Sequence, residues 1–349
     1  MVIAYYGSTM LFKSDKIASQ TPTPIARTSS SRFGMPMRYS ITRFVTIIVA
    51  LIIVSTLSLP AYGYGLSASF LYKLSDFNGI VPFSGVKMFS DDVHNEVYVL
   101  DSGMIRIFNQ AGMEVYRFNE DGSLGTLSAC VVDTEGNIIA LAYDQKGYFL
   151  IRCNYRGDLT SRFELKNIPS AFQAGFRPSS LAYRKGHLYL ADSGSMKIVV
   201  TDEQGLFERG IDLIDVAGFN QKNRGNLEMM GFSVDREGSI LFTIPAEFCA
   251  YKLSPDGALA NFCQRGSAPG KFNIAAGIVS DDGGYIYVSD KLKSSVLIFD
   301  NEFKFINQLG ARGYGPFGFI VPMDMAVLGD KLYVAQGAGQ GVSVFSITH

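Results

Sequence analysis

Tyr285-Ile-Tyr-Val-Ser-Asp290 is the clearest copy of a six-residue phrase that recurs along the chain. Each copy alternates or runs apolar, as a half-buried or buried β-strand does. Turn signals such as Gly283-Gly284 and Glu135-Gly136 precede the copies. The other copies are Glu96-Val-Tyr-Val-Leu-Asp101, Asn137-Ile-Ile-Ala-Leu-Ala142, His187-Leu-Tyr-Leu-Ala-Asp192, Ser239-Ile-Leu-Phe-Thr-Ile244 and Lys331-Leu-Tyr-Val-Ala-Gln336.

The spacing of these copies indicates a repeat fold. Measured between their last residues, with Tyr143 closing the second copy, they lie 42, 49, 52, 46 and 46 residues apart. A period in the mid-forties, with several short strands in each unit, is typical of a β-propeller. The sequence therefore predicts an all-β fold whose first five blades cover residues 83–118, 126–163, 179–210, 229–263 and 275–309.

The last copy supplies only three strands, over residues 323–327, 331–335 and 342–347. The apolar segment 66–74 belongs to no N-terminal blade. If this segment is the outer strand of the last blade, the ring closes and no sheet edge is left broken. We predict a six-bladed propeller over residues 64–349, with an N-terminal strand that closes the last blade.

Charge is distributed unevenly along the 349 residues. Residues 1–63 hold six Lys and Arg and one acid, Asp15, whereas the remainder holds 25 Lys and Arg against 31 Asp and Glu. A mildly acidic body gives no electrostatic reason to expect nucleic-acid binding.

The N-terminal segment has the features of an export signal. Residues 44–59 carry no charge, Arg38 and Arg43 precede them, and Ala61-Tyr62-Gly63 follows. This order predicts a signal peptide over 37–63 and a periplasmic or extracellular body. The alternative is an uncleaved anchor formed by residues 44–59, although a spanning helix needs roughly 20 apolar residues. Residues 1–36 are expected to be a disordered tail, or to precede the true start at Met35 or Met37.

The strand and turn units resemble NHL repeats. The fit is best in the fifth unit, which reads Gly266-Ser-Ala-Pro-Gly-Lys-Phe272, Ala276-Gly-Ile-Val279, Tyr285-Ile-Tyr-Val-Ser-Asp290 and Ser295-Val-Leu-Ile-Phe299. The resemblance covers roughly residues 66–347, but the Asn-His-Leu triplet that follows the aspartate in the family is absent from every copy. It implies a scaffold or recognition role with a protein or polysaccharide partner.

Three copies of the phrase end in aspartate, at Asp101, Asp192 and Asp290. Their recurrence places them at equivalent points around one face, where a ring of carboxylates could bind a cation such as calcium. A carboxylate that recurs with the repeat is more typical of a turn cap that accepts backbone N–H groups. We favour the cap, keep the three as weak metal candidates, and expect no cofactor.

The four cysteines fall into two pairs. In the hairpin around Ser254-Pro-Asp-Gly257, pairing Ser254 with Ala258 places Cys249 opposite Cys263. Opposed residues on neighbouring strands are close enough for a disulfide, which an exported protein can form. We predict a Cys249–Cys263 disulfide. Cys130 and Cys153 fall on the first and third strands of the second blade, and we expect free buried thiols there.

The connectors between blades carry the binding prediction. We expect Arg177, Arg224, Lys271, Arg312 and Tyr314 to contact a partner, because basic and aromatic residues on an acidic molecule suit a protein or an anionic ligand. The connectors also hold several phenylalanines, which we expect mainly to fill gaps between blades: Phe77, Phe83, Phe172, Phe176, Phe219, Phe272 and Phe317.

Two functions follow from these observations. The first is an exported, non-enzymatic propeller that binds a protein or polysaccharide through its inter-blade loops. This would be a monomeric domain that meets a membrane only through an uncleaved leader. The alternative is a metal-dependent enzyme of the lactonase or lyase type, with its metal in the central channel. Elemental analysis for zinc and calcium separates the two.

Overall fold

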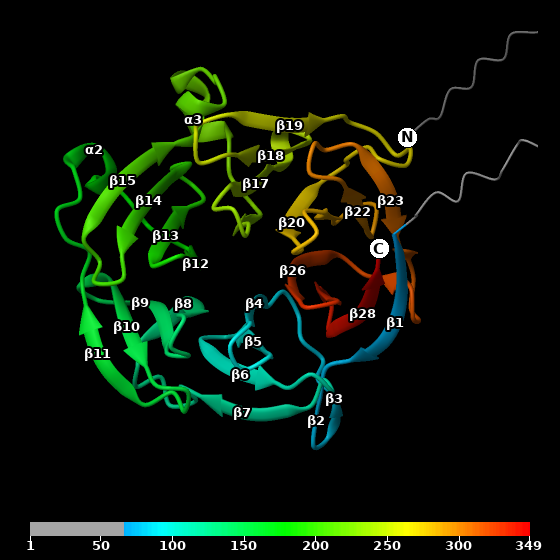
Figure 1. Cartoon of the computed structure of the whole chain (residues 1–349), viewed down its shortest axis with the longest axis horizontal. Coiled ribbons are helices and arrows are strands. Elements are labelled where there is room, and N and C mark those ends of the chain that lie inside the picture. The colour runs from blue at the N-terminus through cyan, green and yellow to red at the C-terminus, as the bar shows by residue number, and fades with distance from the viewer. Residues whose placement is uncertain (1–65) are drawn as a thin grey trace, which may run out of the picture. The chain divides into compact units, whose positions relative to one another are not determined.

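A computed structural model describes residues 66–349. The predicted tail (1–36), signal peptide (37–63) and anchor segment (44–59) lie outside this range. Within it, six four-stranded antiparallel sheets are arranged around a central axis (Figure 1). The all-β, six-bladed propeller that the repeat predicts is confirmed. No helix within residues 66–349 is long and apolar enough to cross a membrane.

The first five blades each use four consecutive strands, ordered from the axis to the rim. Blade one contains β4 (Lys87–Asp91), β5 (Glu96–Asp101), β6 (Met104–Phe108) and β7 (Glu114–Phe118). Blade two contains β8 (Thr126–Val132), β9 (Ile138–Asp144), β10 (Gly147–Cys153) and β11 (Leu159–Phe163). Blade three contains β12 (Ser180–Arg184), β13 (His187–Asp192), β14 (Lys197–Asp202) and β15 (Phe207–Asp212). Blade four contains β16 (Phe232–Val234), β17 (Ile240–Ile244), β18 (Cys249–Leu253) and β19 (Leu259–Cys263). Blade five contains β20 (Ala275–Ser280), β21 (Ile286–Asp290), β22 (Ser295–Phe299) and β23 (Phe305–Leu309).

Blade six joins the two ends of the described chain, as the incomplete last repeat predicts. Its inner strands are β26 (Pro322–Leu328), β27 (Lys331–Gln336) and β28 (Val342–Thr348), and its outer strand is β1 (Ser67–Lys73). The register runs from Ser67 opposite Thr348 to Lys73 opposite Ser343. In Figure 1 the blue β1 therefore lies along the red β28.

The core lies between neighbouring blades. The middle strands of each blade are covered on both faces, so they are mostly apolar, and all five residues of β21 and of β22 are buried. The outer strand β7 has one face against the core, and its three central residues are exposed. This difference explains why the second-strand phrase is the most recognisable part of the repeat.

Hydroxyl groups on second strands link neighbouring blades by binding backbone groups of the first strands. The Thr243 hydroxyl on β17 accepts from the Gly231 amide at 2.8 Å and donates to the Ala276 carbonyl of blade five at 2.6 Å. The Ser289 hydroxyl likewise donates to the Met323 carbonyl of blade six at 3.0 Å. A side chain at Gly231 would collide with the next blade, because its Cβ would lie 2.1 Å from the Ala276 oxygen.

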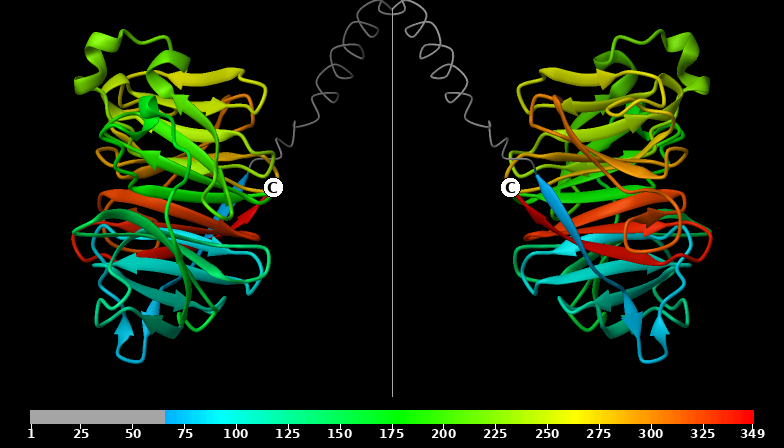
Figure 2. Two further views of the ribbon diagram at one scale, coloured as in Figure 1. Left: turned by 90° about the vertical axis from the view of Figure 1, so that its left-hand side faces the viewer. Right: turned by 90° about the vertical axis from the view of Figure 1, so that its right-hand side faces the viewer.

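The propeller has two distinct faces. The connector face carries the segments that lead from each fourth strand to the next first strand, together with the turns between second and third strands. The turn face carries the other hairpin turns and both ends of the described chain. Figure 2 shows the C-terminus on the face opposite α3. The connectors contain β2 (Ser75–Asp76), β3 (Gly79–Ile80), α2 (Ser170–Gln173), α3 (Leu213–Val216), η1 (Gln221–Asn226), β24 (Ala311–Arg312) and β25 (Gly318–Phe319), whereas η2 (Pro245–Glu247) lies between β17 and β18.

Candidate functional site

The five residues predicted to bind a partner all lie on connectors, but they are in different states. Arg177, Arg312 and Tyr314 are exposed, and Tyr314 keeps 81% of its surface accessible. Lys271 is half-buried against Gly266. Its carbonyl accepts from the Lys293 ammonium at 2.9 Å. Arg177, Arg312 and Tyr314 can therefore contact a partner without first breaking side-chain contacts within the propeller.

The Arg224 guanidinium is occupied within the propeller. It forms an ion pair with Asp212 at 2.5 Å and donates to the Ser195 carbonyl and to Gln221. These bonds join η1 to β15 and to the turn before β14. Arg224 therefore positions a connector, and we do not carry it forward as a contact residue.

Two neighbouring connectors expose a set of apolar side chains, which we call the connector patch: Phe77, Ile80, Tyr314, Phe317 and Val321. The turn between β27 and β28 lies between the two connectors. Its Gly337 amide donates to the Val321 carbonyl at 3.0 Å, and its Gly341 amide donates to the Phe83 carbonyl at 3.1 Å. The five side chains of the patch thus lie on the two connectors that flank the β27–β28 turn of blade six.

The connector phenylalanines differ in how far their side chains are exposed. Phe83 and Phe272 are buried, and Phe272 packs edge-to-face on Phe262 with ring centroids 5.7 Å apart. These two fill gaps between strands, as expected. Phe77, at the tip of the β2–β3 hairpin, is 99% exposed, and Phe317 is 47% exposed. Phe77 therefore fills no gap, whereas Phe317 also packs on the buried Phe345, with ring centroids 5.8 Å apart. The remaining three, Phe172, Phe176 and Phe219, are half-buried.

A buried arginine fixes the hairpin that presents Phe77. Arg106 on β6 forms ion pairs with Asp76 at 2.9 Å and with Glu114, and its guanidinium lies 5.1 Å from the centre of the Phe83 ring. Asp76 also accepts from the Asn78 amide at 2.7 Å. The Asn78 amide and the Arg106 side chain together lower the pKa of the Asp76 carboxyl. Arg106 therefore anchors the hairpin to blade one, because its guanidinium pairs with Asp76 of the hairpin and with Glu114 of β7.

Two of the three second-strand aspartates accept hydrogen bonds from backbone amides, as expected for turn caps. Asp192 accepts from the amides of Arg177, Gly194 and Ser195, at 2.7 to 3.1 Å. Asp290 similarly binds amides of the connector before β20 and of the turn after β21. Asp101 accepts only from the Ser102 hydroxyl, at 3.2 Å. Among the described residues, no three His, Cys, Asp or Glu side chains gather where they could hold a metal.

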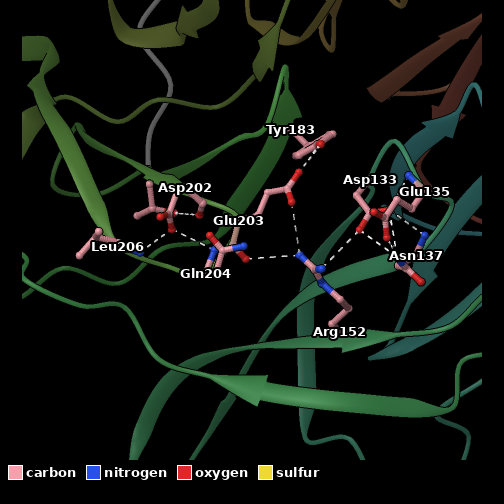
Figure 3. Close-up of polar contacts among 10 residues, drawn as sticks. Asp133, Glu135, Asn137, Arg152, Tyr183, Asp202, Glu203, Gln204 and Leu206 are labelled. Carbon is pink, nitrogen blue, oxygen red and sulfur yellow. Dashed lines mark hydrogen bonds and ion pairs between the residues drawn. The ribbon is translucent and has the colours of Figure 1, made fainter.

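The turn face carries a second set of aspartates that the repeat pattern did not single out. Four are buried at the turns between first and second strands, and each has a cationic or histidine neighbour: Asp91 with His94, Asp133 with Arg152, Asp235 with Lys252, and Asp281 with His349. Figure 3 shows one of them extended between blades. There Arg152 lies between Asp133 and Glu203, and the Tyr183 hydroxyl donates to Glu203 at 2.5 Å.

A cavity of about 430 Å³ opens on the turn face, and we call it the turn-face pocket. Its wall comes from the first strands of all six blades, and its mouth comes from the turns that follow them. At the opposite end of the first strands, the Lys87 ammonium of blade one donates to the Ser128 and Ser179 carbonyls of blades two and three. Sequence reasoning missed this pocket because its lining comes from six separate segments of the chain.

Four carboxyl groups line the turn-face pocket, and Asp324 on β26 is the one that is not at a turn between first and second strands. Asp324 accepts from the Met88 amide at 2.9 Å. Burial raises the pKa of the Asp324 carboxyl, and the Lys87 ammonium opposes part of that shift. Burial also lowers the pKa of Lys87 itself. The two charges are therefore desolvated together at the inner end of the pocket.

The cysteine register agrees with the sequence prediction. Cys249 on β18 is the direct partner of Cys263 on β19, with Cα atoms 4.2 Å apart, and their sulfur atoms are bonded in the structure. Cys130 and Cys153 are buried free thiols on β8 and β10. Burial raises the pKa of the Cys153 thiol to about 11, so this thiol is unreactive at neutral pH.

Comparisons with known proteins support the fold. A family model described as a six-bladed β-propeller matches residues 275–348. No curated protein sequence matches the chain. Similar solved structures include a protein of unknown function from Bacteroides thetaiotaomicron, which is 12% identical with a TM-score of 0.57; the match covers 81% of this chain and 76% of that one.

Two further solved structures show the same arrangement. An auxiliary nutrient binding protein from Bacteroides ovatus is 14% identical, with a TM-score of 0.55 and coverage of 82% of this chain and 78% of that one. The virginiamycin B lyase of Staphylococcus aureus is 10% identical, with a TM-score of 0.52 and coverage of 81% and 99%. At such low identity these similarities concern the fold, because one propeller architecture serves binding proteins and enzymes alike.

Proposed function

We propose that this chain is an exported, non-enzymatic, NHL-like propeller that binds a protein partner through its connector face. The observation that carries the proposal is the connector patch, with Arg312 beside it in sequence. Aromatic residues and arginine are enriched where protein interfaces concentrate their binding energy. Isolated exposed apolar residues would need no explanation, but this set lies on two connectors joined through one turn.

The anchored hairpin supports the same proposal. A loop held in its bound shape before association has less conformational freedom to lose on binding. The Arg106 ion pairs provide that restraint for the hairpin bearing Phe77. A protein partner uses such a projecting aromatic by receiving it in a pocket. We take a polysaccharide as the competing occupant of the same face.

Site-specific photocrosslinking tests the face. A photoreactive phenylalanine analogue at Tyr314 should give a discrete crosslinked protein in the native host. The matched control is Tyr155, which is 56% exposed on the turn face. Equal crosslinking from both positions would contradict the face assignment. A product from Tyr314 that glycosidases remove would replace the protein with a polysaccharide.

The captured protein then permits a direct affinity measurement. Phe77→Ser and the pair Arg177→Glu with Arg312→Glu should each weaken binding by about tenfold or more, as loss of interface anchors does. Unchanged melting temperatures would show that the variants fold. Export has a separate test, because N-terminal sequencing of the secreted protein should begin after Gly63 if the leader is cleaved there.

A further inference from the structure

The turn-face pocket has the size and composition of a small-molecule site. Ligand pockets commonly measure about 300–1,000 Å³ and are mostly apolar with a few polar groups. The volume here is within that range. Apolar residues from six first strands form most of the wall, and among them Phe89, Phe232, Val279 and Val327 are only half-buried. The wall is thus open to an apolar ligand.

Polar side chains also line the pocket, and the hydroxyl of one of them has no hydrogen-bond partner among the described residues. The Ser233 hydroxyl on β16 is buried and has no hydrogen-bond partner within residues 66–349. Buried hydroxyls without a partner are uncommon in folded proteins. Ser233 and Asp324 both line the pocket. The Ser233 oxygen itself has less than 1 Å² of accessible surface, so a ligand in the pocket would contact the rest of this residue.

Charge at the mouth is uneven around the ring. Arg184 and Lys185 on blade three and Arg236 on blade four line one side, whereas Asp91 on blade one and Asp133 on blade two line the other. Arg184 also donates through Nε to the Val234 carbonyl at 3.2 Å, which leaves its other guanidinium nitrogens free of hydrogen bonds within residues 66–349. Asp92 on blade one lies within electrostatic reach of Arg184. The Arg236 side chain is 68% exposed, and its only ion-pair contact in the described chain is a long one, 3.8 Å, to Asp282. The side formed by blades three and four is therefore suited to an anion.

We propose that the turn-face pocket binds a small molecule with an apolar body and one anionic group. The apolar body occupies the channel between the first strands. The anionic group lies at the mouth, against Arg184, Lys185 and Arg236. This site is separate from the connector patch and faces the opposite way, so the propeller would carry a small ligand and a protein partner at the same time.

Two fluorescent probes with nearly the same ring system test this proposal. 1-Anilinonaphthalene-8-sulfonate is anionic, whereas N-phenyl-1-naphthylamine lacks the sulfonate. Both should bind the folded protein, and the anionic probe should bind more tightly. Raising the salt concentration should weaken only the anionic probe, because salt screens exposed charges.

Variants locate the binding. Ser233→Leu and Ser280→Leu fill the pocket from different blades, and each should abolish binding of both probes. Replacing Arg184, Lys185 and Arg236 by Gln should raise the Kd of the anionic probe by about tenfold, or about 1.4 kcal/mol for the three partly exposed charges together. The Kd of the neutral probe should remain unchanged. Arg312→Gln, on the other face, is the matched control.

Three results would overturn the proposal. The first is undiminished probe binding by both filled variants when their melting temperatures match that of the wild type. The second is an equal loss of affinity for both probes in the Gln variant, and the third is that the wild type binds neither probe. Two filled variants are used because one substitution could unfold its blade. If one unfolds, the other decides the outcome. If both unfold, the charge variant decides, because it leaves the wall intact.

Discussion

Replacing Gly231 by alanine tests whether close contact between first strands holds the ring together. Gly231 is the last residue before β16, and its amide is bound by the Thr243 hydroxyl, which also binds the Ala276 carbonyl. An alanine Cβ would lie 2.1 Å from the Ala276 oxygen and 2.9 Å from the Ile278 nitrogen. Both atoms belong to the backbone of blade five, so relief requires the blades to separate.

The cost can be estimated from this geometry. Cβ atoms essentially never approach another atom to less than 3.0 Å, so the first contact must open by at least 0.9 Å. Overpacking of a well-packed interior costs typically about 1–3 kcal/mol, occasionally more. We expect the upper end, because a backbone carbonyl cannot change rotamer. About 3 kcal/mol would lower the melting temperature by roughly 6–12 °C in a domain of this size.

The assay is thermal and urea unfolding of the wild type and two variants. Gly225→Ala is the control, since a Cβ there meets nothing within 4 Å and the Gly225 backbone is not left-handed. We expect Gly225→Ala to leave the unfolding free energy nearly unchanged and Gly231→Ala to lower it. Equal stability of the two alanine variants would refute the reasoning that blade contact excludes a side chain at Gly231.

Three further predictions concern the charges and the sulfur atoms. Arg106→Met should destabilise the protein by about 3 kcal/mol, because Glu114 would keep a largely buried charge without its partner. Limited proteolysis should then cut the 75–80 hairpin faster; unaltered cleavage would argue against the anchor. Non-reducing mass spectrometry should show one Cys249–Cys263 link, and Cys263→Ala should lower the free energy of unfolding by about 3 kcal/mol, as expected for a loop of this length. Two free thiols at these positions would contradict the pairing. Asp324→Asn should weaken the pH dependence of stability. Because the folded pKa of Asp324 is raised, the wild type loses stability as pH rises above the unfolded value of about 3.9, until the folded pKa is passed. Parallel stability profiles of the two proteins from pH 4 to pH 7 would count against this role.

The blades could be predicted from sequence because their signals are local. The second strands are buried on both faces, so their apolar phrase is nearly continuous, and glycine-containing turns separate it from its neighbours. The closing strand followed from counting, since a ring of four-stranded blades with one strand missing needs a donor. The opposition of Cys249 and Cys263 followed from the register of a single hairpin.

The candidate site was only partly predictable, because residue type does not determine exposure on a connector. Phe272 and Phe77 have the same side chain, yet one is buried and the other is 99% exposed. The sequence around Arg224 does not show that its guanidinium pairs with Asp212 on the preceding strand, so it resembles an exposed contact residue. The turn-face pocket depends on six segments meeting at one axis, and no local pattern encodes that meeting.

The pairing of β1 with β28 also sets an order of events during synthesis. The first strand to be made can find its partner only after the last residues have left the ribosome, because Ser67 is paired with Thr348. Blades one to five can form as they emerge, but the ring cannot be sealed before the chain is complete. A nascent chain of this protein therefore stays open at one seam throughout translation.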